Sequence, residues 1–334
     1  MKSEYIVLSE ERNVSLTAYI QPVGGEFTGI SERPAVLVIP GGGYRYCSDR
    51  EADPVAMAYL KAGYHAFILR YSCGQHAAWP TPLNDYEQAM SLIREKAGEW
   101  HIAPDRIAVI GFSAGGHLAA CAATMSENRP NAAILGYPDI SGAFAWDLLK
   151  DPPDVLAAVD SNTCPCFIFA SRTDNLVPIK NSVGMIDALT RNDVAFESHI
   201  YSNAPHGLST GDASVGVQEM CRRYPNWVAD SLTWLEDVLG GFGPEGLTAP
   251  NFGFKINGNH DETLNLDCTL EYLATFPEVR ALVPDCFEGP YRYPEAAGSV
   301  ITLGSFLRFA KLSEEAVREI EAKLKAIPKE KKED

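Results

Sequence analysis

One stretch, Ile107–Ala120, constrains the fold more than any other part of this 334-residue chain. It begins with apolar, mostly β-branched residues that favour a strand, passes through a Gly-x-Ser-x-Gly sequence centred on Ser113, and continues into small residues that suit a helix. A serine between a buried strand and a helix is the pattern of a nucleophile elbow. Gly111 and Gly115 lack the Cβ atoms that would collide where strand and helix cross. The stretch therefore predicts a strand, a sharp turn bearing Ser113, and a helix; a turn without chemistry is the alternative.

Chemistry at Ser113 requires two partner side chains elsewhere in the chain. A serine hydroxyl becomes a good nucleophile when a base takes its proton and a third group orients that base. With this type of turn the order along the chain is serine, acid, histidine. His206, on a loop after the last expected strand, is therefore predicted to be the base. The other histidines are less suited: His65 and His199 lie in expected strands, His117 on the elbow helix and His101 in a polar stretch. His76 and His260 lie in loops, where substrate contact stays open.

Asp174 is the predicted acid. It follows the apolar strand Cys166–Ala170 and leaves room for one helix and one strand before His206. The alternative role for Asp174 is to cap the next helix. Other acids between Ser113 and His206 lie just before or inside an irregular segment: Asp139, Asp147, Asp151, Asp154 and Asp160.

Attack by Ser113 would create an oxyanion that needs prearranged N–H donors. The N–H of Ala114, at the start of the elbow helix, is one predicted donor. The others are Gly42 and Gly43 in the triple glycine after the apolar strand Pro34–Ile39, because glycine readily lets successive amides line a pocket. No Gly-Lys-Ser/Thr follows the glycines, which argues against a phosphate-binding loop.

The order of expected elements indicates the fold class. A polar turn joins two opening strands, and apolar strands then alternate with helices, so the sequence predicts a doubly wound, mostly parallel sheet with the candidate residues at the carboxyl ends of its strands. The expected strands are 5–7, 14–20, 34–39, 65–71, 107–110, 132–137, 166–170 and 195–201. The expected helices are 52–62, 85–96, 179–190 and 227–239, with the elbow helix over 116–120.

Interruptions in this alternation of strands and helices predict the domain organisation. Residues 1–240 are expected to form the catalytic domain, with 141–163 as a short lid of two helices around Pro152-Pro153. The glycine-rich residues 241–250 are expected to be a linker. Residues 251–334 are expected to form a small, mainly helical domain, with helices over 267–282 and 303–324.

Composition limits the partners. A formal net charge of −16 argues against nucleic acid and anionic membranes, and no apolar run is long enough to span a bilayer. The N-terminus lacks the apolar core of a signal peptide, so a cytoplasmic protein is expected, with its eight cysteines as free thiols. The cysteines and the acids near the C-terminus show no metal-ligand spacing, so neither metal nor cofactor is expected. The expected partner is a small-molecule substrate, and a homo-oligomer stays open.

Several motifs together resemble the α/β-hydrolase fold, and within it the acetylxylan esterase-like or carbohydrate esterase-like branch related to hormone-sensitive-lipase-type esterases. The resemblance implies that Gly42 and Gly43 join Ala114 in an oxyanion hole, and that Glu51 and Asp85 organise loops near the site. Pro40 stands where lipase-type relatives carry histidine, so any role of that histidine is absent. The motifs are Pro40-Gly41-Gly42-Gly43-Tyr44, Ser48-Asp49-Arg50-Glu51, Pro54-Val55-Ala56, Arg70-Tyr71, Pro82-Leu83-Asn84-Asp85, 111–117, 171–178 and Pro205-His206-Gly207.

The resulting expectation is a serine esterase that removes short acyl groups, above all acetyl, from sugars or small alcohols through an acyl-enzyme. Two alternatives remain: a peptidase or amidase with the same triad, and a hydrolase fold used only for binding. Further candidates for substrate contact or support are Tyr44, Glu51, His76, Trp79, Asp85 and His117.

Overall fold

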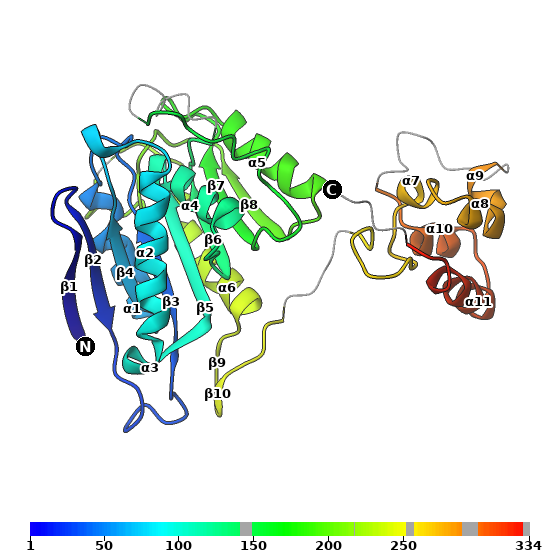
Figure 1. Ribbon diagram of the computed structural model, residues 1–334, viewed down its shortest axis with the longest axis horizontal. Coiled ribbons are helices and arrows are strands. Elements are labelled where there is room, and N and C mark those ends of the chain that lie inside the picture. The colour runs from blue at the N-terminus through cyan, green and yellow to red at the C-terminus, as the bar shows by residue number, and fades with distance from the viewer. Residues whose placement is uncertain (141–148, 217, 252–256, 289–299, 330–334) are drawn as a thin grey trace. The chain divides into compact units, whose positions relative to one another are not determined.

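The computed structural model describes residues 1–140, 149–216, 218–251, 257–288 and 300–329 (Figure 1). The chain divides into two compact units, Met1–Gly253 and Phe254–Asp334, which we describe separately.

An eight-stranded sheet forms the centre of the large unit, with the strand order β1-β2-β4-β3-β5-β6-β7-β8. The pairs β1–β2 and β2–β4 are antiparallel, and all other pairs are parallel. The predicted doubly wound, mostly parallel sheet is therefore confirmed. Its strands are β1 (Lys2–Ser9), β2 (Val14–Ile20), β3 (Arg33–Ile39), β4 (His65–Arg70), β5 (Ile102–Phe112), β6 (Ala132–Gly136), β7 (Cys166–Ser171) and β8 (Phe196–Tyr201).

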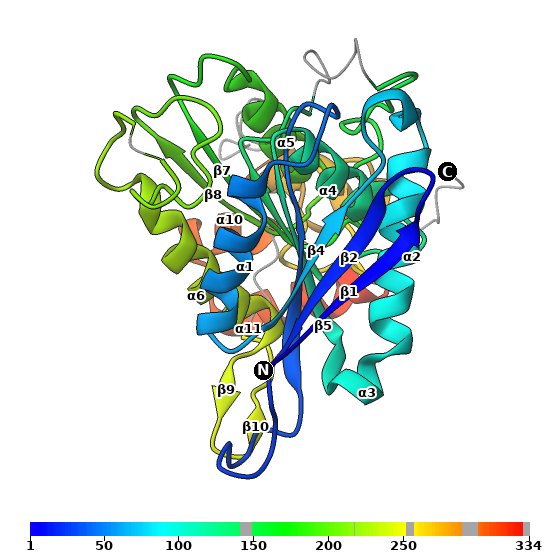
Figure 2. The same cartoon turned by 90° about the vertical axis from the view of Figure 1, so that its left-hand side faces the viewer.

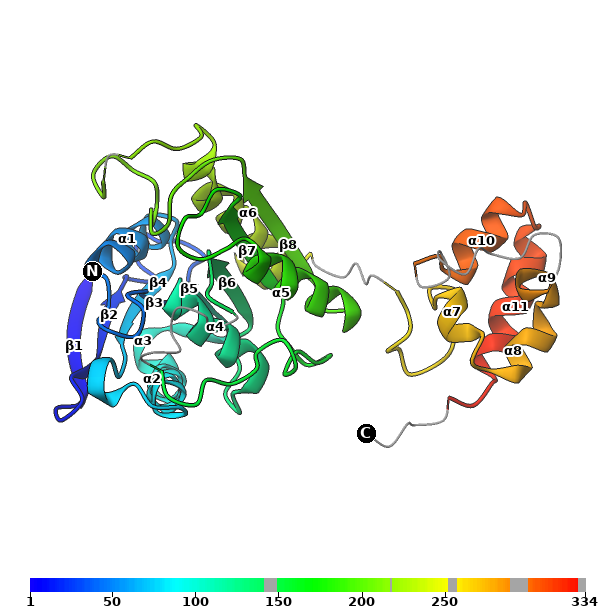
Figure 3. The same ribbon diagram turned by 90° about the horizontal axis from the view of Figure 1, so that it is seen from above.

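Helices cover both faces of this sheet, because the central strands are apolar on both sides. Figures 2 and 3 show α1 (Asp53–Lys61) and α6 (Trp227–Leu239) on one face, with α2 (Thr81–Glu95) and α4 (Ala114–Met125) on the other. Each face has its own core of buried apolar side chains. Two further helices, α3 (Ala97–Trp100) and α5 (Lys180–Arg191), contribute to the core on the α2 and α4 side.

The stretch expected to be a linker, 241–250, belongs to the large unit. It contains a small hairpin, β9 (Phe242–Gly243) and β10 (Gly246–Leu247). The Thr248 carbonyl accepts a hydrogen bond from Arg106, and the Asn251 N–H donates to Asp237, each at 2.8 Å. These bonds attach the stretch to the sheet domain, so the division between the units falls later, after Gly253.

The expected lid lies partly outside the described residues, which omit 141–148. Its described part, 149–163, forms turns, so the helix expected over 153–159 is wrong. Asp154 accepts a hydrogen bond from the Ala157 N–H, and Asp160 accepts one from the Asn162 N–H. Such side-chain bonds to nearby backbone stabilise turns in competition with a helix.

The small unit packs short helices around its own apolar core, which includes Leu270, Leu303 and Leu324. The two long helices expected here are each interrupted. In the first expected range, Pro277 begins a new helix, and Pro284 begins another just beyond that range. In the second expected range, Lys311, with φ of 56°, ends one helix, and Ser313 then caps the last one. The helices are α7 (Leu270–Leu273), α8 (Pro277–Leu282), α9 (Pro284–Phe287), α10 (Leu303–Phe309) and α11 (Glu314–Lys325).

Candidate active site

Ser113 occupies the sharp turn between β5 and α4, as the sequence predicts. Its backbone has φ of 52° and ψ of −117°, an arrangement rare for a residue with a side chain. The turn brings α4 so close to β3 that a Cβ on Gly115 would lie 2.2 Å from the Ile39 carbonyl oxygen. Glycine at 115 is therefore a steric requirement of this crossing.

The structure joins Ser113, His206 and Asp174 in one hydrogen-bonded chain. The Nε2 atom of His206 lies 2.8 Å from the Ser113 hydroxyl oxygen, and its Nδ1 atom lies 2.7 Å from Asp174 Oδ2. With a proton on Nδ1 donating to Asp174, Nε2 is free to accept the serine proton. The three residues come from three strand ends, after β5, β7 and β8, which meet at the carboxyl edge of the sheet.

Neighbouring groups hold the acid and the base in place. The second oxygen of Asp174 accepts hydrogen bonds from the N–H groups of Leu176 and Val177, at 2.9 and 2.8 Å. These bonds hold the turn after β7, and Asp174 does not cap α5, whose N-cap residue is Ile179 and which has no side-chain cap bond. The His206 N–H donates to the Asn175 side chain, and the Tyr137 ring packs against the imidazole with 4.9 Å between ring centroids.

Three backbone N–H groups lie beside Ser113. Ala114 is the first residue of α4, so its N–H has no acceptor within the helix. Gly42 and Gly43 follow β3 with φ of 124° and 62°, and neither N–H donates to a protein oxygen within the described ranges. A Cβ on Gly42 would lie 2.1 Å from the Tyr46 carbonyl oxygen, so only glycine fits there. These amides have the character of an oxyanion hole.

Glu51 connects the loop that follows β3 and contains Gly41–Gly43, here called the glycine loop, to the loop that carries His206. Its carboxylate accepts one hydrogen bond from the Gly41 N–H at 2.9 Å and another from the Tyr137 hydroxyl at 2.5 Å. The same hydroxyl accepts from the Ser209 N–H, three residues after His206. Burial raises the pKa of Glu51, while the bonds from Tyr137 and Gly41 oppose that rise. The supporting role that the resemblance implies for Glu51 agrees with this network.

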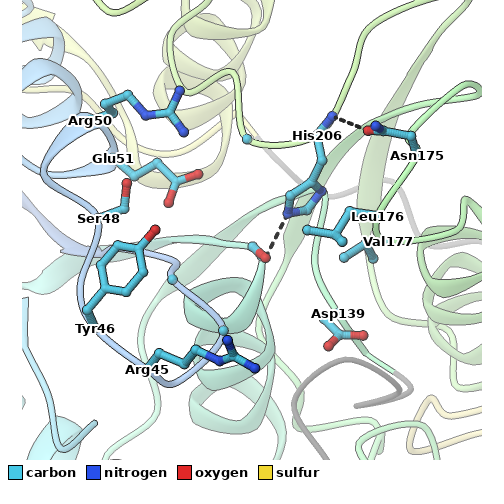
Figure 4. A pocket seen from close by; sticks show the side chains of 14 residues that line it. Arg45, Tyr46, Ser48, Arg50, Glu51, Asp139, Asn175, Leu176, Val177 and His206 are labelled. Carbon is cyan, nitrogen blue, oxygen red and sulfur yellow. Dashed lines mark hydrogen bonds between the residues drawn. The ribbon is translucent and has the colours of Figure 1, made fainter. Parts of the chain in front are cut away.

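A pocket of about 540 Å³ opens over the Ser113 hydroxyl (Figure 4). This volume suits a small organic ligand. The glycine loop forms one side of the pocket, and the segments carrying Asn175 and His206 form the other (Figure 4). The lining residues are Gly42, Gly43, Arg45, Tyr46, Ser48, Arg50, Glu51, Ser113, Asp139, Asn175, Leu176, Val177, His206 and Gly207.

Among the six further candidates, Glu51 lines the pocket and the other five lie elsewhere. Tyr44 and His117 are fully buried beneath the loop, with the Tyr44 hydroxyl 2.8 Å from His117 Nδ1. Burial lowers the pKa of His117 to about 4. Buried Asp85 accepts hydrogen bonds from the Arg12 guanidinium and from the Ser72 N–H, which fixes the chain after β4.

His76 and Trp79 complete that group. His76 is half-buried and lies 3.2 Å from the Gln75 side-chain nitrogen. Trp79 packs against the core on the α2 side, and its backbone N–H donates to the Lys150 carbonyl.

Sequence reasoning did not single out several groups around the nucleophile. Tyr137 directly follows β6, the strand next to the elbow strand, and this position was the available signal. Asn175 adjoins the predicted acid. Arg45 and Arg50 lie in the loop of the triple glycine, whose length and motif could have marked them as pocket residues.

The eight cysteines are free thiols, five of them buried. Across the described parts of the chain, no group of three or more His, Cys, Asp or Glu side chains could hold a metal ion. The helices that the structure describes include none with both the length and the apolar character needed to cross a bilayer.

Comparison with known families gives two matches in the large unit. Residues 28–139, which contain the glycine loop and Ser113, match the family BD-FAE. Residues 150–241, which contain Asp174 and His206, match the prolyl oligopeptidase family.

The curated relatives include an acetylxylan esterase and a xylanase. An acetylxylan esterase from Xylanibacter ruminicola is 30% identical over 227 residues, which cover 61% of this chain and 47% of that protein. Endo-1,4-beta-xylanase B from Butyrivibrio fibrisolvens is 30% identical over 211 residues, 54% of this chain and 33% of that protein. The chain thus spans less than half the length of these two relatives.

Solved structures match the large unit more completely. An α/β-hydrolase enzyme from a Medee basin deep-sea metagenome library is 41% identical, with a TM-score of 0.67, and the match covers 72% of this chain and 98% of that one. A carboxylesterase from Lactobacillus plantarum is 26% identical, with a TM-score of 0.66 and coverage of 73% and 100%. Since a solved hydrolase is matched over nearly its whole length, the chain belongs to the α/β-hydrolase family, where its relatives are carboxylic ester hydrolases.

Proposed function

We propose that the protein is a serine esterase that removes short acyl groups, above all acetyl, from sugars or small alcohols. The observation that carries this proposal is the continuous hydrogen-bonded chain from Asp174 through His206 to Ser113. The relatives named acetylxylan esterase and acetyl ester-xyloside bifunctional hydrolase, the latter from Caldicellulosiruptor lactoaceticus at 28% identity, support acetylated sugars as the substrate class. That structure has a TM-score of 0.63 and is matched over 97% of its length, and over 71% of this chain.

In the proposed mechanism the Ser113 oxygen attacks the ester carbonyl while His206 Nε2 takes the hydroxyl proton. The negative charge that develops on the carbonyl oxygen is stabilised by the N–H groups of Gly42, Gly43 and Ala114. Asp174 holds the imidazole and stabilises its positive charge. When the intermediate collapses, His206 returns the proton to the leaving alkoxide, and the acyl group stays on Ser113.

Water then completes the cycle. His206 takes a proton from water, the hydroxide attacks the acyl-serine, and the same N–H groups stabilise the second oxyanion. Collapse releases the carboxylic acid and restores the Ser113 hydroxyl. Leu176 and Val177 add an apolar wall to the pocket, which suits a short acyl chain.

The test is turnover of 4-nitrophenyl acetate by the full chain and by Ser113→Ala. We expect a loss of at least about a thousandfold in kcat, since the base and the oxyanion donors have no nucleophile to act on. Ser182→Ala is the matched control, a buried serine on α5 that does not line the pocket. Retention of most turnover by Ser113→Ala would refute the proposal.

The match of residues 150–241 to the prolyl oligopeptidase family favours a second candidate, hydrolysis of amides by the same triad. It predicts that aminoacyl 4-nitroanilides are turned over faster than 4-nitrophenyl acetate. Labelling of Ser113 by a fluorophosphonate would separate both activities from a protein that only binds, because it requires an activated serine.

A further inference from the structure

The loop that supplies the glycine amides also brings two arginines to the pocket. Arg45 and Arg50 both line the cavity that contains Ser113 and His206. Both residues are exposed. Figure 4 shows their side chains extending from the loop toward the middle of the pocket, with Tyr46 and Ser48 between them along the chain.

Across the described residues, the side chains of Arg45 and Arg50 form neither a hydrogen bond nor an ion pair. Four arginines of the large unit are instead bound to carboxylates: Arg12 to Asp85, Arg70 to Asp49, Arg129 to Asp160 and Arg191 to Asp187. In a chain with a net charge of −16, two unpartnered guanidinium groups in one pocket are available to an anion from outside.

The carboxylates that line the same pocket do not neutralise the two arginines. Glu51 and Asp139 are each 3% exposed, so they lie at the base of the pocket. Glu51 has its two oxygens hydrogen-bonded to Gly41 and Tyr137 and acts on Arg50 only through space. Asp139 also has an interaction partner. The carboxylates are thus buried and engaged, while the two arginines are exposed.

We propose that the preferred substrate is an acyl ester of a sugar that carries a carboxylate, and that Arg45 and Arg50 bind this carboxylate while Ser113 attacks the acyl group. This inference rests on the proposed esterase function. The planar guanidinium matches a carboxylate with two parallel hydrogen bonds, and the same chemistry would accept a phosphate. Because both groups are exposed, their contribution falls as ionic strength rises.

The experiment compares three acetylated methyl glycosides that differ only at the terminal carbon of the sugar: a glucoside, the corresponding glucuronoside, and a glucoside with a phosphate there. Acetate release by the full chain gives kcat and KM for each. We expect kcat/KM for the glucuronoside to exceed that for the glucoside by at least about tenfold, mainly through a lower KM. We also expect this ratio to shrink with added salt.

Variants assign the preference to the arginines. Arg45→Gln and Arg50→Gln should each lower the ratio of glucuronoside to glucoside, and the lysine replacements Arg45→Lys and Arg50→Lys should retain part of it. Arg191→Gln, which removes an exposed charge at the far end of α5, should leave the ratio unchanged.

A ratio of one or less in the unaltered protein, or a ratio that both glutamine variants preserve, would overturn the inference. A higher kcat/KM for the phosphate than for the carboxylate would overturn the choice of carboxylate. Failure of the esterase function itself has a different signature, because the protein would then hydrolyse neither the neutral glucoside nor 4-nitrophenyl acetate.

Discussion

At the scale of single residues, Ser113 combines backbone strain with firm anchoring. A positive φ in a residue with a side chain costs on the order of 1–3 kcal/mol. The surrounding backbone offsets this cost. The Ser113 N–H donates to the Gly136 carbonyl at 3.0 Å, and its own carbonyl accepts from the N–H groups of His117 and Asp139. The strained turn therefore persists and presents the hydroxyl to His206.

His65 predicts how stability depends on pH. Its Nδ1 accepts a hydrogen bond from the Gln21 N–H, and its Nε2 donates to the His101 carbonyl, so the neutral ring is fully satisfied. Burial lowers its pKa to about 4, as it does for His117. Between pH 6.5 and 4, these two histidines bind protons in the unfolded chain but not in the folded chain. The free energy of unfolding should therefore fall as pH decreases through this window, by up to about 3 kcal/mol per histidine.

Urea unfolding at pH 7 and pH 4.5, followed by tryptophan fluorescence, measures this loss. The His65→Asn variant keeps an acceptor for the Gln21 N–H but cannot be protonated, so its stability should fall less steeply with acid. An identical pH dependence in the variant and the parent protein would contradict the assignment.

The residues that could be predicted from the sequence are those whose neighbours carry a strong pattern. Ser113 and Asp174 each follow an apolar strand, and His206 follows the last strand of the sheet, in the chain order that the elbow motif requires. The structure brings the three together. Arg45 and Arg50 are exposed polar residues in an irregular loop, where periodicity gives no information. Their approach to the pocket depends on the path of the loop in three dimensions.

At the scale of elements, the segment between β3 and α1 organises one side of the site. The Gly41 carbonyl accepts from the Ser48 N–H, the Gly42 carbonyl accepts from the Arg45 N–H, and Glu51 holds the Gly41 N–H. The Ser209 hydroxyl donates to the Arg50 carbonyl, which adds a second connection to the His206 loop. The conformation of the oxyanion amides thus depends on a carboxylate outside the triad.

Glu51→Gln should lower both activity and stability. Glu51 accepts two hydrogen bonds, whereas a glutamine amide has only one oxygen, so either the Gly41 N–H or the Tyr137 hydroxyl would face another donor. A buried donor without an acceptor costs about 1–3 kcal/mol. We expect a reduced urea midpoint and a lower kcat on 4-nitrophenyl acetate.

Glu87→Gln is the matched control for that change. Glu87 on α2 also accepts two hydrogen bonds, from the Ser126 hydroxyl and the Glu127 N–H, but both reach its Oε1 atom and it does not line the pocket. A glutamine keeps that one oxygen, so this change should leave both kcat and the urea midpoint nearly unchanged. Equal kcat for Glu51→Gln and the parent protein would show that Glu51 does not position the amides.

Element boundaries were harder to predict than the elements themselves. The sheet follows from apolar runs that two layers of helices must cover. Helix α2 begins at Thr81, four residues before the predicted start, because Pro82 is accepted in the first turn of a helix. In the small unit, the pattern continues across Pro277 and suggests one helix over 267–282, where the structure has two, α7 and α8.

At the scale of the whole molecule, the residues proposed for catalysis all belong to Met1–Gly253. The bond from the Asn251 N–H to Asp237 places the end of this unit after the hairpin β9–β10. All five tryptophans of the sequence also lie within it, at positions 79, 100, 146, 227 and 234. Tryptophan fluorescence therefore reports the unfolding of the catalytic unit alone.

A chain that ends at residue 253 should keep the kcat and KM of the full chain for 4-nitrophenyl acetate. Its urea midpoint, followed by tryptophan fluorescence, should also stay the same, since the small unit has a separate apolar core. The matched comparison is a chain that ends at residue 240, which loses the hairpin and the bonds of Thr248 and should be less stable. Loss of activity on removing 254–334 would show that the small unit contributes to the site.

The segment 40–51 has a consequence for attempts to alter this enzyme by mutation. It contains the glycine amides, Glu51 and both pocket arginines, so a library confined to it changes substrate preference and catalytic rate together. Leu176 and Val177 line the same pocket from a different segment, outside 40–51. Under the proposed function, we therefore expect variation at 176 and 177 to change selectivity with less loss of turnover than variation within 40–51.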